Sequence, residues 1–179
     1  LRRWSIEVDD SAGQVLGTTP AGAFFRLVAT ALGTNWAPVP LLALLKHPFT
    51  RLGREAGDVR SLVRRLELLA LRGPRPGPGI DGLLHALGDR RADHELDALL
   101  SDLGSATAEL DALMRAPKAP LAQLIAHHVQ TLENLARAEP DSNNPVWENE
   151  DGEALHNFVT ELIGDAGALG FVDTGAYPA

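Results

Sequence analysis

Two short clusters of histidines and carboxylates hold the side chains whose chemistry could bind a metal ion. They are Asp93-His94-Glu95 and the pair His127-His128, and zinc accepts both imidazole and carboxylate ligands. Neither cluster has the H-E-x-x-H spacing. Adjacent side chains on a helix also point about 100° apart, so His127 and His128 do not readily face one ion. We therefore interpret these histidines as surface or core residues and predict no metal site.

Hydrolytic and nucleotide-binding patterns are equally weak. Four acidic residues near the C-terminus could be drawn into a two-carboxylate scheme, but a negatively charged first helical turn also explains them; they are Glu148, Glu150, Asp151 and Glu153. The segment 73–79, GPRPGPG, lacks the Lys-Ser/Thr of a phosphate-binding loop, and no G-x-S-x-G motif occurs. We predict no catalytic residue and no cofactor. An independent hydrolase remains an alternative that rests only on this scatter of side chains.

Positive charge is concentrated in the middle third of the 179 residues. Residues 1–45 carry no net charge, residues 46–91 carry +5 and residues 92–179 carry −13, which gives the net charge of −8. Affinity for nucleic acids comes largely from neutralised phosphates, so an acidic chain binds them poorly on its own. The middle third could still add a basic surface to a larger assembly. The alternative interpretation is a solvated helix face.

Leucine and alanine dominate the apolar residues, which make up 45% of the chain, whereas only 5% of residues are aromatic. Both side chains lose little rotamer freedom in a helix, and apolar residues recur at helical spacing along most of the chain. We predict an all-α fold, an irregular bundle of about seven helices. The expected helices cover residues 20–32, 38–47, 57–71, 80–87, 93–103, 105–114, 120–138 (starting at Pro117 or Pro120) and 149–166.

Three of these helices have a recognisable apolar face. The first should bury Phe24, Leu27, Val28 and Leu32, and the last Ala154, Leu155, Phe158, Val159 and Leu162. The helix at 57–71 should bury Val59, Leu62, Val63, Leu66, Leu69 and Ala70, and its arginines lie off that stripe. The isolated aromatics Trp36, Trp147 and Tyr177 are interpreted as packing residues.

Alternation of apolar and polar residues from Trp4 to Val8 predicts a single strand. One strand is not stable alone, so we assign it to a neighbouring α/β domain outside this chain. The predicted organisation is the edge of that domain at 1–18, a helical lobe with a basic face at 19–72, a Gly/Pro/Arg linker at 73–79 and an acidic helical lobe at 80–179.

The compartment is predicted from three absences. The chain has no cysteine, which is compatible with a reducing cytoplasm, and it has neither a membrane-spanning run nor a signal peptide. We therefore expect a cytoplasmic protein that does not enter a membrane. Because the chain begins with Leu1 rather than Met, we interpret it as part of a longer protein.

Three blocks of sequence occur in the order and at the spacing of a known family. They are IEVDDSAGQVLGTTPAGAFFRLV at 6–28, APVPLLALLKHPF at 37–49 and LELLALRGPRPGPGIDGL at 66–83. Together they resemble alphaproteobacterial AddB, the double-strand break repair subunit of the AddAB helicase–nuclease. Residues 84–179 resemble the family only in their helical pattern and in the tail Gly175-Ala176-Tyr177.

Such a resemblance implies a role in processing DNA ends. In the AddB family, an inactivated superfamily I helicase-like region precedes a nuclease of the PD-(D/E)xK type with an iron–sulfur cluster. The chain resembles a helical insertion between the two. It has no Walker A lysine, no nuclease metal ligands and no cluster cysteines, so none of those roles is carried over. The implied partners are the AddA subunit and, in the full complex, DNA.

Five arginines are the candidate DNA contacts under this interpretation: Arg60, Arg64, Arg65, Arg72 and Arg75. The guanidinium group suits phosphate because its planar fork donates two parallel hydrogen bonds. The helices would then shape a DNA channel or dock the partner helicase subunit. The alternative is a purely structural or protein-interaction module without DNA contact.

Overall fold

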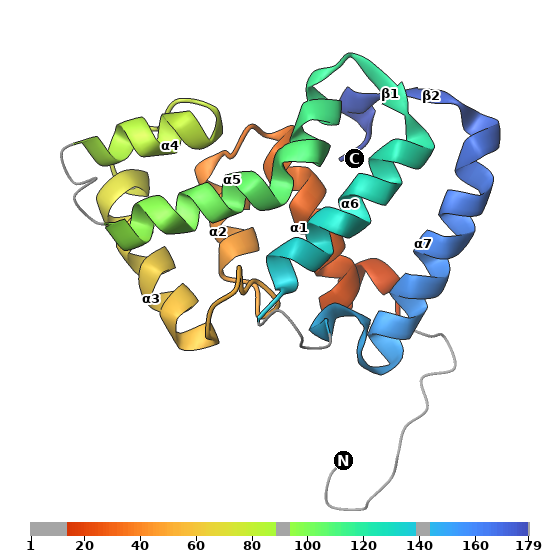
Figure 1. Ribbon diagram of the computed structural model, residues 1–179, viewed down its shortest axis with the longest axis horizontal. Coiled ribbons are helices and arrows are strands. Elements are labelled where there is room, and N and C mark those ends of the chain that lie inside the picture. Colours follow the sequence, from red (N-terminus) through yellow and green to blue (C-terminus); the bar gives the residue numbers. More distant parts are fainter. Residues whose placement is uncertain (1–13, 89–93, 139–143, 179) are drawn as a thin grey trace, which may run out of the picture.

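The computed structural model describes residues 14–88, 94–138 and 144–178, and within these the chain is mostly helical. This confirms the all-α prediction (Figure 1). The predicted strand at Trp4–Val8 lies outside the described residues. The α-helices are α1 (Pro20–Gly33), α2 (Pro38–Leu45), α3 (Ala56–Leu66), α4 (Gly79–Leu87), α5 (His94–Arg115), α6 (Leu121–Ala136) and α7 (Asn149–Leu169).

Helix α1 begins as its sequence predicts. The Thr19 side chain accepts a hydrogen bond from the Gly22 backbone N–H at 3.2 Å, and Pro20 takes the first helical position, where a missing N–H costs nothing. Gly22 also permits a close approach, because a Cβ atom there would lie 1.9 Å from the carbonyl oxygen of Leu16. The short 3₁₀ turn Leu16–Thr18 can therefore fold back onto α1.

Helix α3 continues without a break into a π-helical turn, Glu67–Leu71. The helix predicted over 57–71 is therefore present, but its last turn is wider than an α-helical turn. In this turn the backbone N–H of Arg72 donates to the carbonyl of Glu67 at 3.1 Å, a spacing of five residues. The extended segment after Arg72 leads to α4, as its prolines predict.

Helix α5 corrects the sequence prediction of two helices at 93–103 and 105–114. It is one continuous helix that passes through Gly104. Leu103, Thr107 and Leu110 are all buried and continue one face across the glycine. A glycine within a helix costs about 1 kcal/mol, which burial of this continuous face outweighs.

A two-stranded antiparallel ribbon was not predicted. Strand β1 (Lys118–Pro120) pairs with β2 (Phe171–Asp173), with Ala119 opposite Val172. The ribbon joins the start of α6 to the end of α7 (Figure 1). It thereby places the C-terminal residues, including Tyr177, against α6 and α1.

One hydrophobic core contains side chains from both sides of the linker at 73–79, among them Phe24, Leu66, Leu83 and Leu132. The loop after α2 also caps α6, because the backbone N–H groups of Arg51 and Leu52 both donate to the carbonyl of Leu135, at 2.8 and 3.0 Å. The predicted division into two lobes is not tested by these contacts and stays a prediction.

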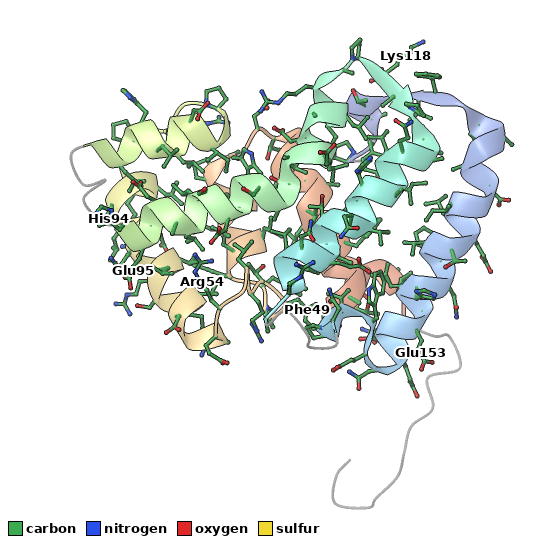
Figure 2. All side chains as sticks on the ribbon, viewed as in Figure 1. Phe49, Arg54, His94, Glu95, Lys118 and Glu153 are labelled. Atoms are coloured by element: carbon green, nitrogen blue, oxygen red, sulfur yellow. The ribbon has the colours of Figure 1, made fainter. Side chains whose placement is uncertain are left out.

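Helix α7 lies at the edge of the bundle (Figure 2). It buries a narrower face than predicted. Leu155 and Val159 are buried and Leu162 is partly covered, but Ala154 and Phe158 are exposed. The prediction that these two residues are buried is therefore wrong. A helix that packs on one side only, here against α6 and α1, cannot bury a broad stripe. Among the described residues, no helix is long and apolar enough to cross a membrane.

Candidate nucleic-acid interface

An open groove of about 540 Å³ runs along the outer face of α3 and its π-helical turn, beside the end of α2. We call it the basic groove. It is lined by Lys46, Arg60, Arg64, Glu67, Leu68 and Arg72. Four of these side chains are cationic and one is a carboxylate, so the groove carries an excess of three positive charges.

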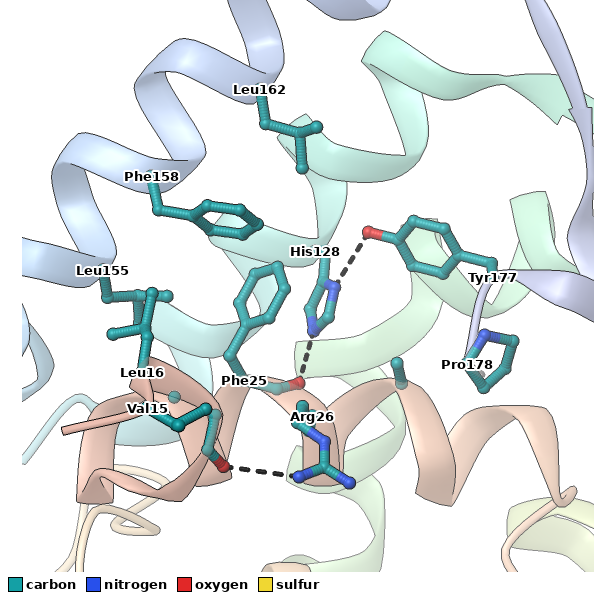
Figure 3. Close-up of a pocket in the computed structure, with 13 residues that line it drawn as sticks. Val15, Leu16, Phe25, Arg26, His128, Leu155, Phe158, Leu162, Tyr177 and Pro178 are labelled. Atoms are coloured by element: carbon teal, nitrogen blue, oxygen red, sulfur yellow. Dashed lines mark hydrogen bonds between the residues drawn. The ribbon is translucent and has the colours of Figure 1, made fainter. Parts of the chain in front are cut away.

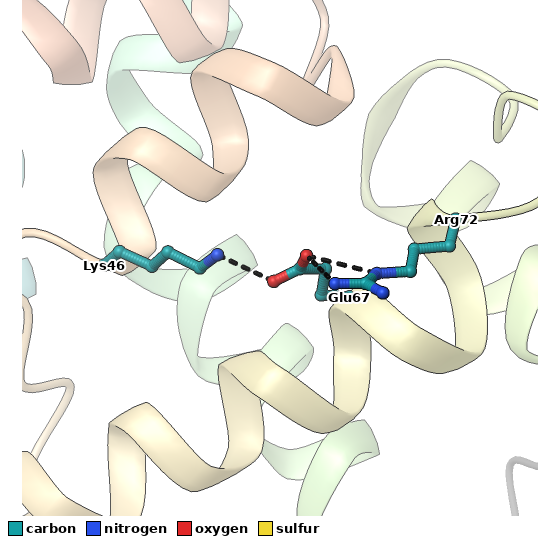
Figure 4. A network of polar contacts seen from close by, with 3 residues as sticks. All are labelled: Lys46, Glu67 and Arg72. Atoms are coloured by element: carbon teal, nitrogen blue, oxygen red, sulfur yellow. Dashed lines mark hydrogen bonds and ion pairs between the residues drawn. The ribbon is translucent and has the colours of Figure 1, made fainter.

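Glu67 organises two of the four cations (Figure 4). Its Oε2 accepts a hydrogen bond from Lys46 Nζ at 2.7 Å, and its Oε1 accepts from Arg72 Nη2 at 3.0 Å and Nε at 3.3 Å. Hydrogen bonds from Lys46 and Arg72 lower the pKa of Glu67 below its usual value. The carboxylate therefore stays ionised at neutral pH and holds both cations at the groove.

The π-helical turn explains how Glu67 and Arg72 meet. Residues five apart do not share a face on an ordinary α-helix. In the wider turn the two backbones are hydrogen-bonded directly, and the side chains then lie on one side. No pattern in the sequence distinguishes this turn from a continuation of α3.

Arg60 and Arg64 are four residues apart on α3 and therefore share a face, opposite the buried Leu62 and Leu66. Both arginines are exposed, and neither forms an ion pair with any side chain in the described part of the chain. Their guanidinium groups are thus available to an external anion.

The structure brings three of the five predicted arginines together, Arg60, Arg64 and Arg72. Arg65 instead lies on another side of α3, where Nη1 donates to Glu95 Oε2 of α5 at 2.7 Å. Glu95 stands at the start of α5, where this helix meets α3 (Figure 2). Arg75 lines a separate hollow beside Trp36. DNA contact by any of the five stays a prediction.

Lys46 was missed by sequence reasoning. It follows α2 and stands fourteen residues before Arg60 in the sequence. Only the packing of α2 against α3 brings its ammonium group to Glu67. A lone lysine after an apolar helix carries no signal of that contact.

The histidines that began the search for chemistry do not form a metal site within 14–88, 94–138 and 144–178, where no group of three potential ligands is close enough to hold an ion. Asp93 lies outside the described residues. His128 is buried, whereas His127 is partly exposed. The two rings of this pair therefore do occupy different environments.

Both nitrogens of His128 are already used (Figure 3). Nε2 lies 2.8 Å from the carbonyl oxygen of Phe25, which can only accept, so Nε2 carries the proton. Nδ1 then accepts from the Tyr177 hydroxyl at 2.9 Å. Burial lowers the pKa of His128 to about 4. The ring is thus neutral at pH 7 and, with both nitrogens bonded, has no free position for acid–base catalysis.

The three aromatic residues expected to pack do so with additional contacts. Trp36 is buried. Trp147 Nε1 donates to Glu133 Oε1 at 2.9 Å, and the ring packs edge-on against His156. Tyr177, although far from α6 in sequence, forms the hydrogen bond to His128 described above. The sequence indicated burial but could not indicate these partners.

Comparisons with protein-family models, with curated proteins and with solved structures found no match for this chain. The chain's own geometry and the resemblance of its three sequence blocks are therefore the basis for the function proposed next.

Proposed function

We propose that the chain is a noncatalytic helical part of a DNA-repair helicase–nuclease subunit of the AddB type, and that its basic groove contacts DNA phosphates. The observation that carries the DNA contact is the excess of positive charge in an open groove. Phosphates are bound chiefly by such arrangements of lysine and arginine.

The four cations differ in their readiness to bind phosphate. Lys46 and Arg72 are already paired with Glu67, which holds them in place but offsets part of their charge. Arg60 and Arg64 have no such partner in the described residues and stand one helical turn apart. These two are therefore the principal phosphate contacts in this proposal, and Lys46 and Arg72 extend the basic surface.

The charge of the whole chain limits what the groove can do alone. A net charge of −8 repels a polyanion at distances where salt does not screen it. The groove therefore acts within the complete helicase–nuclease, where other basic surfaces hold the DNA and this one helps to shape its channel. The isolated chain is expected to bind duplex DNA weakly or not at all.

Docking of the AddA subunit is the second candidate function. It is favoured by large apolar side chains that α7 and β2 leave exposed: Phe158, Ile163, Leu169 and Phe171. Large exposed apolar side chains are a feature of protein-interaction surfaces. This role requires no DNA contact by the groove.

A salt titration of DNA-end binding by the complete complex tests the first function. Arg64→Gln should reduce the affinity about 3- to 10-fold at low salt. It should also make the negative slope of the logarithm of the association constant against log [salt] shallower by roughly 1. The double change Arg60→Gln with Arg64→Gln should make this slope shallower by about 2. Arg137→Gln is the matched control, since it removes one exposed positive charge from the end of α6.

Two outcomes separate the candidate functions. An unchanged affinity and slope for the double variant would remove DNA contact from the groove. If Phe158→Ser with Phe171→Ser then abolished capture of AddA, the chain would act as a protein-docking module. If the Arg60→Gln, Arg64→Gln double variant instead loses DNA affinity and still captures AddA, the proposed groove function is supported.

A further inference from the structure

A second concavity of about 560 Å³ lies away from the basic groove, among α1, α6, α7 and the C-terminal residues (Figure 3). We call it the apolar pocket. Its walls are mainly Leu16, Phe25, Leu155, Phe158 and Leu162, and His128 and Tyr177 stand on one side. The volume is that of a typical small-molecule site, and such sites combine apolar walls with a few polar groups.

The polar groups of the pocket define the ligand that fits. His128 has both nitrogens bonded, and Tyr177 uses its proton to donate to His128, so Tyr177 offers only an acceptor. Among the described side chains that line the pocket, the one strong donor is Arg26, which is exposed there. No carboxylate side chain lines the pocket in the described residues.

Arg26 is held in place but not neutralised. Its Nη1 donates to the backbone carbonyl of Gly17 at 3.3 Å, which fixes the side chain across the edge of the pocket. Arg26 forms no ion pair with a side chain of the described residues. The remaining N–H groups of its planar fork match the two oxygens of a carboxylate.

We infer that the apolar pocket binds a small amphipathic carboxylate, with its apolar body against Phe25, Leu155 and Phe158 and its carboxylate at Arg26. Covering Phe158, which is 44% exposed, removes apolar surface from water. The cation at the edge selects an acid over a neutral ligand of the same length. This inference uses none of the residues of the basic groove and goes beyond the proposed function.

Nuclear magnetic resonance of the full chain provides a site-specific test, because Tyr177 is the only tyrosine. With ring-labelled tyrosine, decanoate should shift the Tyr177 signals and saturate them. Decan-1-ol has the same apolar body without charge, and it should need at least about tenfold higher concentration, the value of one charge-assisted hydrogen bond. Decanoate is used below the concentration at which it forms micelles, and decan-1-ol below its solubility limit in water.

Variants then test which residue contacts the carboxylate of the ligand and which contacts its apolar body. Arg26→Gln should weaken decanoate to the affinity of decan-1-ol, whereas Arg137→Gln should leave both affinities unchanged. Phe158→Ser should weaken both probes, since it shortens the apolar wall. Both Arg26 and Phe158 are exposed, so these changes should leave the thermal unfolding midpoint close to that of the unchanged chain.

Several results would overturn the inference. They are unshifted Tyr177 signals at millimolar decanoate, or equal affinities for the acid and the alcohol. Without any ligand, a shift of the Tyr177 signals caused by Trp4→Ser would show that the N-terminal residues of the chain occupy the pocket instead. A dependence of the signals on chain concentration would assign the pocket to a second copy. None of these results bears on DNA binding by the groove.

Discussion

The basic groove and the apolar pocket use their polar side chains in opposite ways. In the groove, cations on α3 and after α2 are exposed, and a single carboxylate holds two of them. In the pocket, His128 is buried and is hydrogen-bonded to Tyr177 and to the Phe25 carbonyl. Exposed ion pairs contribute little to stability, whereas a buried polar group is costly once it loses its partner. The difference indicates that side chains of the groove can change with little loss of stability, whereas a change in the His128–Tyr177 pair beside the pocket lowers the stability markedly.

The largest expected effect is that of His128→Ala. The change removes a buried ring, which stacks on Phe25 with centroids 3.8 Å apart, and leaves the Phe25 carbonyl without its donor. We expect the free energy of unfolding to fall by about 2–5 kcal/mol, measured in urea. Arg64→Ala in the groove should stay within about 0.5 kcal/mol of the unchanged chain. Similar losses of unfolding free energy in both variants would contradict the proposed difference between the groove and the His128–Tyr177 pair.

A second prediction concerns pH. The pKa of His128 is lowered to about 4 in the folded chain, whereas an unfolded histidine titrates near 6.5. The unfolded state therefore binds a proton first as pH falls. The stabilising contribution of neutral His128 is complete above about pH 6.5, and about 3 kcal/mol of it is lost on going down to pH 4. Urea unfolding at a series of pH values measures this slope.

The control for the pH prediction is a pair of histidine variants. His128→Gln should flatten the pH dependence, although it lowers stability at every pH. His127→Gln should keep the original slope. Burial also lowers the pKa of His47, but that contribution is common to all three chains and cancels in the comparison. An unaltered slope in His128→Gln would assign the pH dependence elsewhere.

The hydroxyl of Tyr177 gives an intermediate effect. Tyr177→Phe keeps the ring but leaves Nδ1 of His128 without its donor. The free energy of unfolding should fall by about 1–3 kcal/mol. Thermal unfolding of the double variant His128→Ala with Tyr177→Phe measures the coupling, because the second change should then cost much less. Additive losses would show that the two side chains act independently.

In the groove, Glu67→Gln should act in the opposite direction from the arginine variants. It removes the carboxylate that offsets Lys46 and Arg72. DNA-end binding by the complete complex should become about 2- to 5-fold tighter at low salt, with a salt slope steeper by up to about 1. The chain should unfold at nearly the same temperature. A weaker DNA affinity would indicate that the positions of the two cations matter more than their net charge.

The smallest expected effect is that of Arg65→Gln. Arg65 pairs with Glu95 at the contact of α3 and α5 and lies outside the groove. Stability should fall by about 0–1 kcal/mol, and the salt slope of DNA binding should remain that of the unchanged complex. Comparison with Arg64→Gln, one residue away, tests whether the side of α3, rather than its total charge, determines DNA contact.

Local pattern was sufficient for most helices. Thr19 and Pro20 marked the start of α1, and the spacing of Val59, Leu62, Val63 and Leu66 predicted the buried face of α3. These signals lie within a few turns of one helix, where side-chain spacing alone determines which residues share a face. The all-α class and the outward direction of Arg60 and Arg64 followed from the sequence for the same reason.

Features that depend on contacts between different helices were decided by packing and were not predicted from the sequence. The long buried face through Thr107 kept α5 continuous at Gly104, and the position of α7 at the edge left Phe158 exposed. The β1–β2 ribbon has three residues in each strand, too few to show a period.

The amino-acid sequence by itself determined the helical class, the faces of the helices and the concentration of positive charge in the middle third. Only the tertiary structure decided which charges meet. It placed Lys46 beside Glu67, directed Arg65 to Glu95 and brought Tyr177 to His128. The physical reason is that helical periodicity acts between neighbours in the chain, whereas these contacts join side chains 21, 30 and 49 residues apart and exist only after the helices pack.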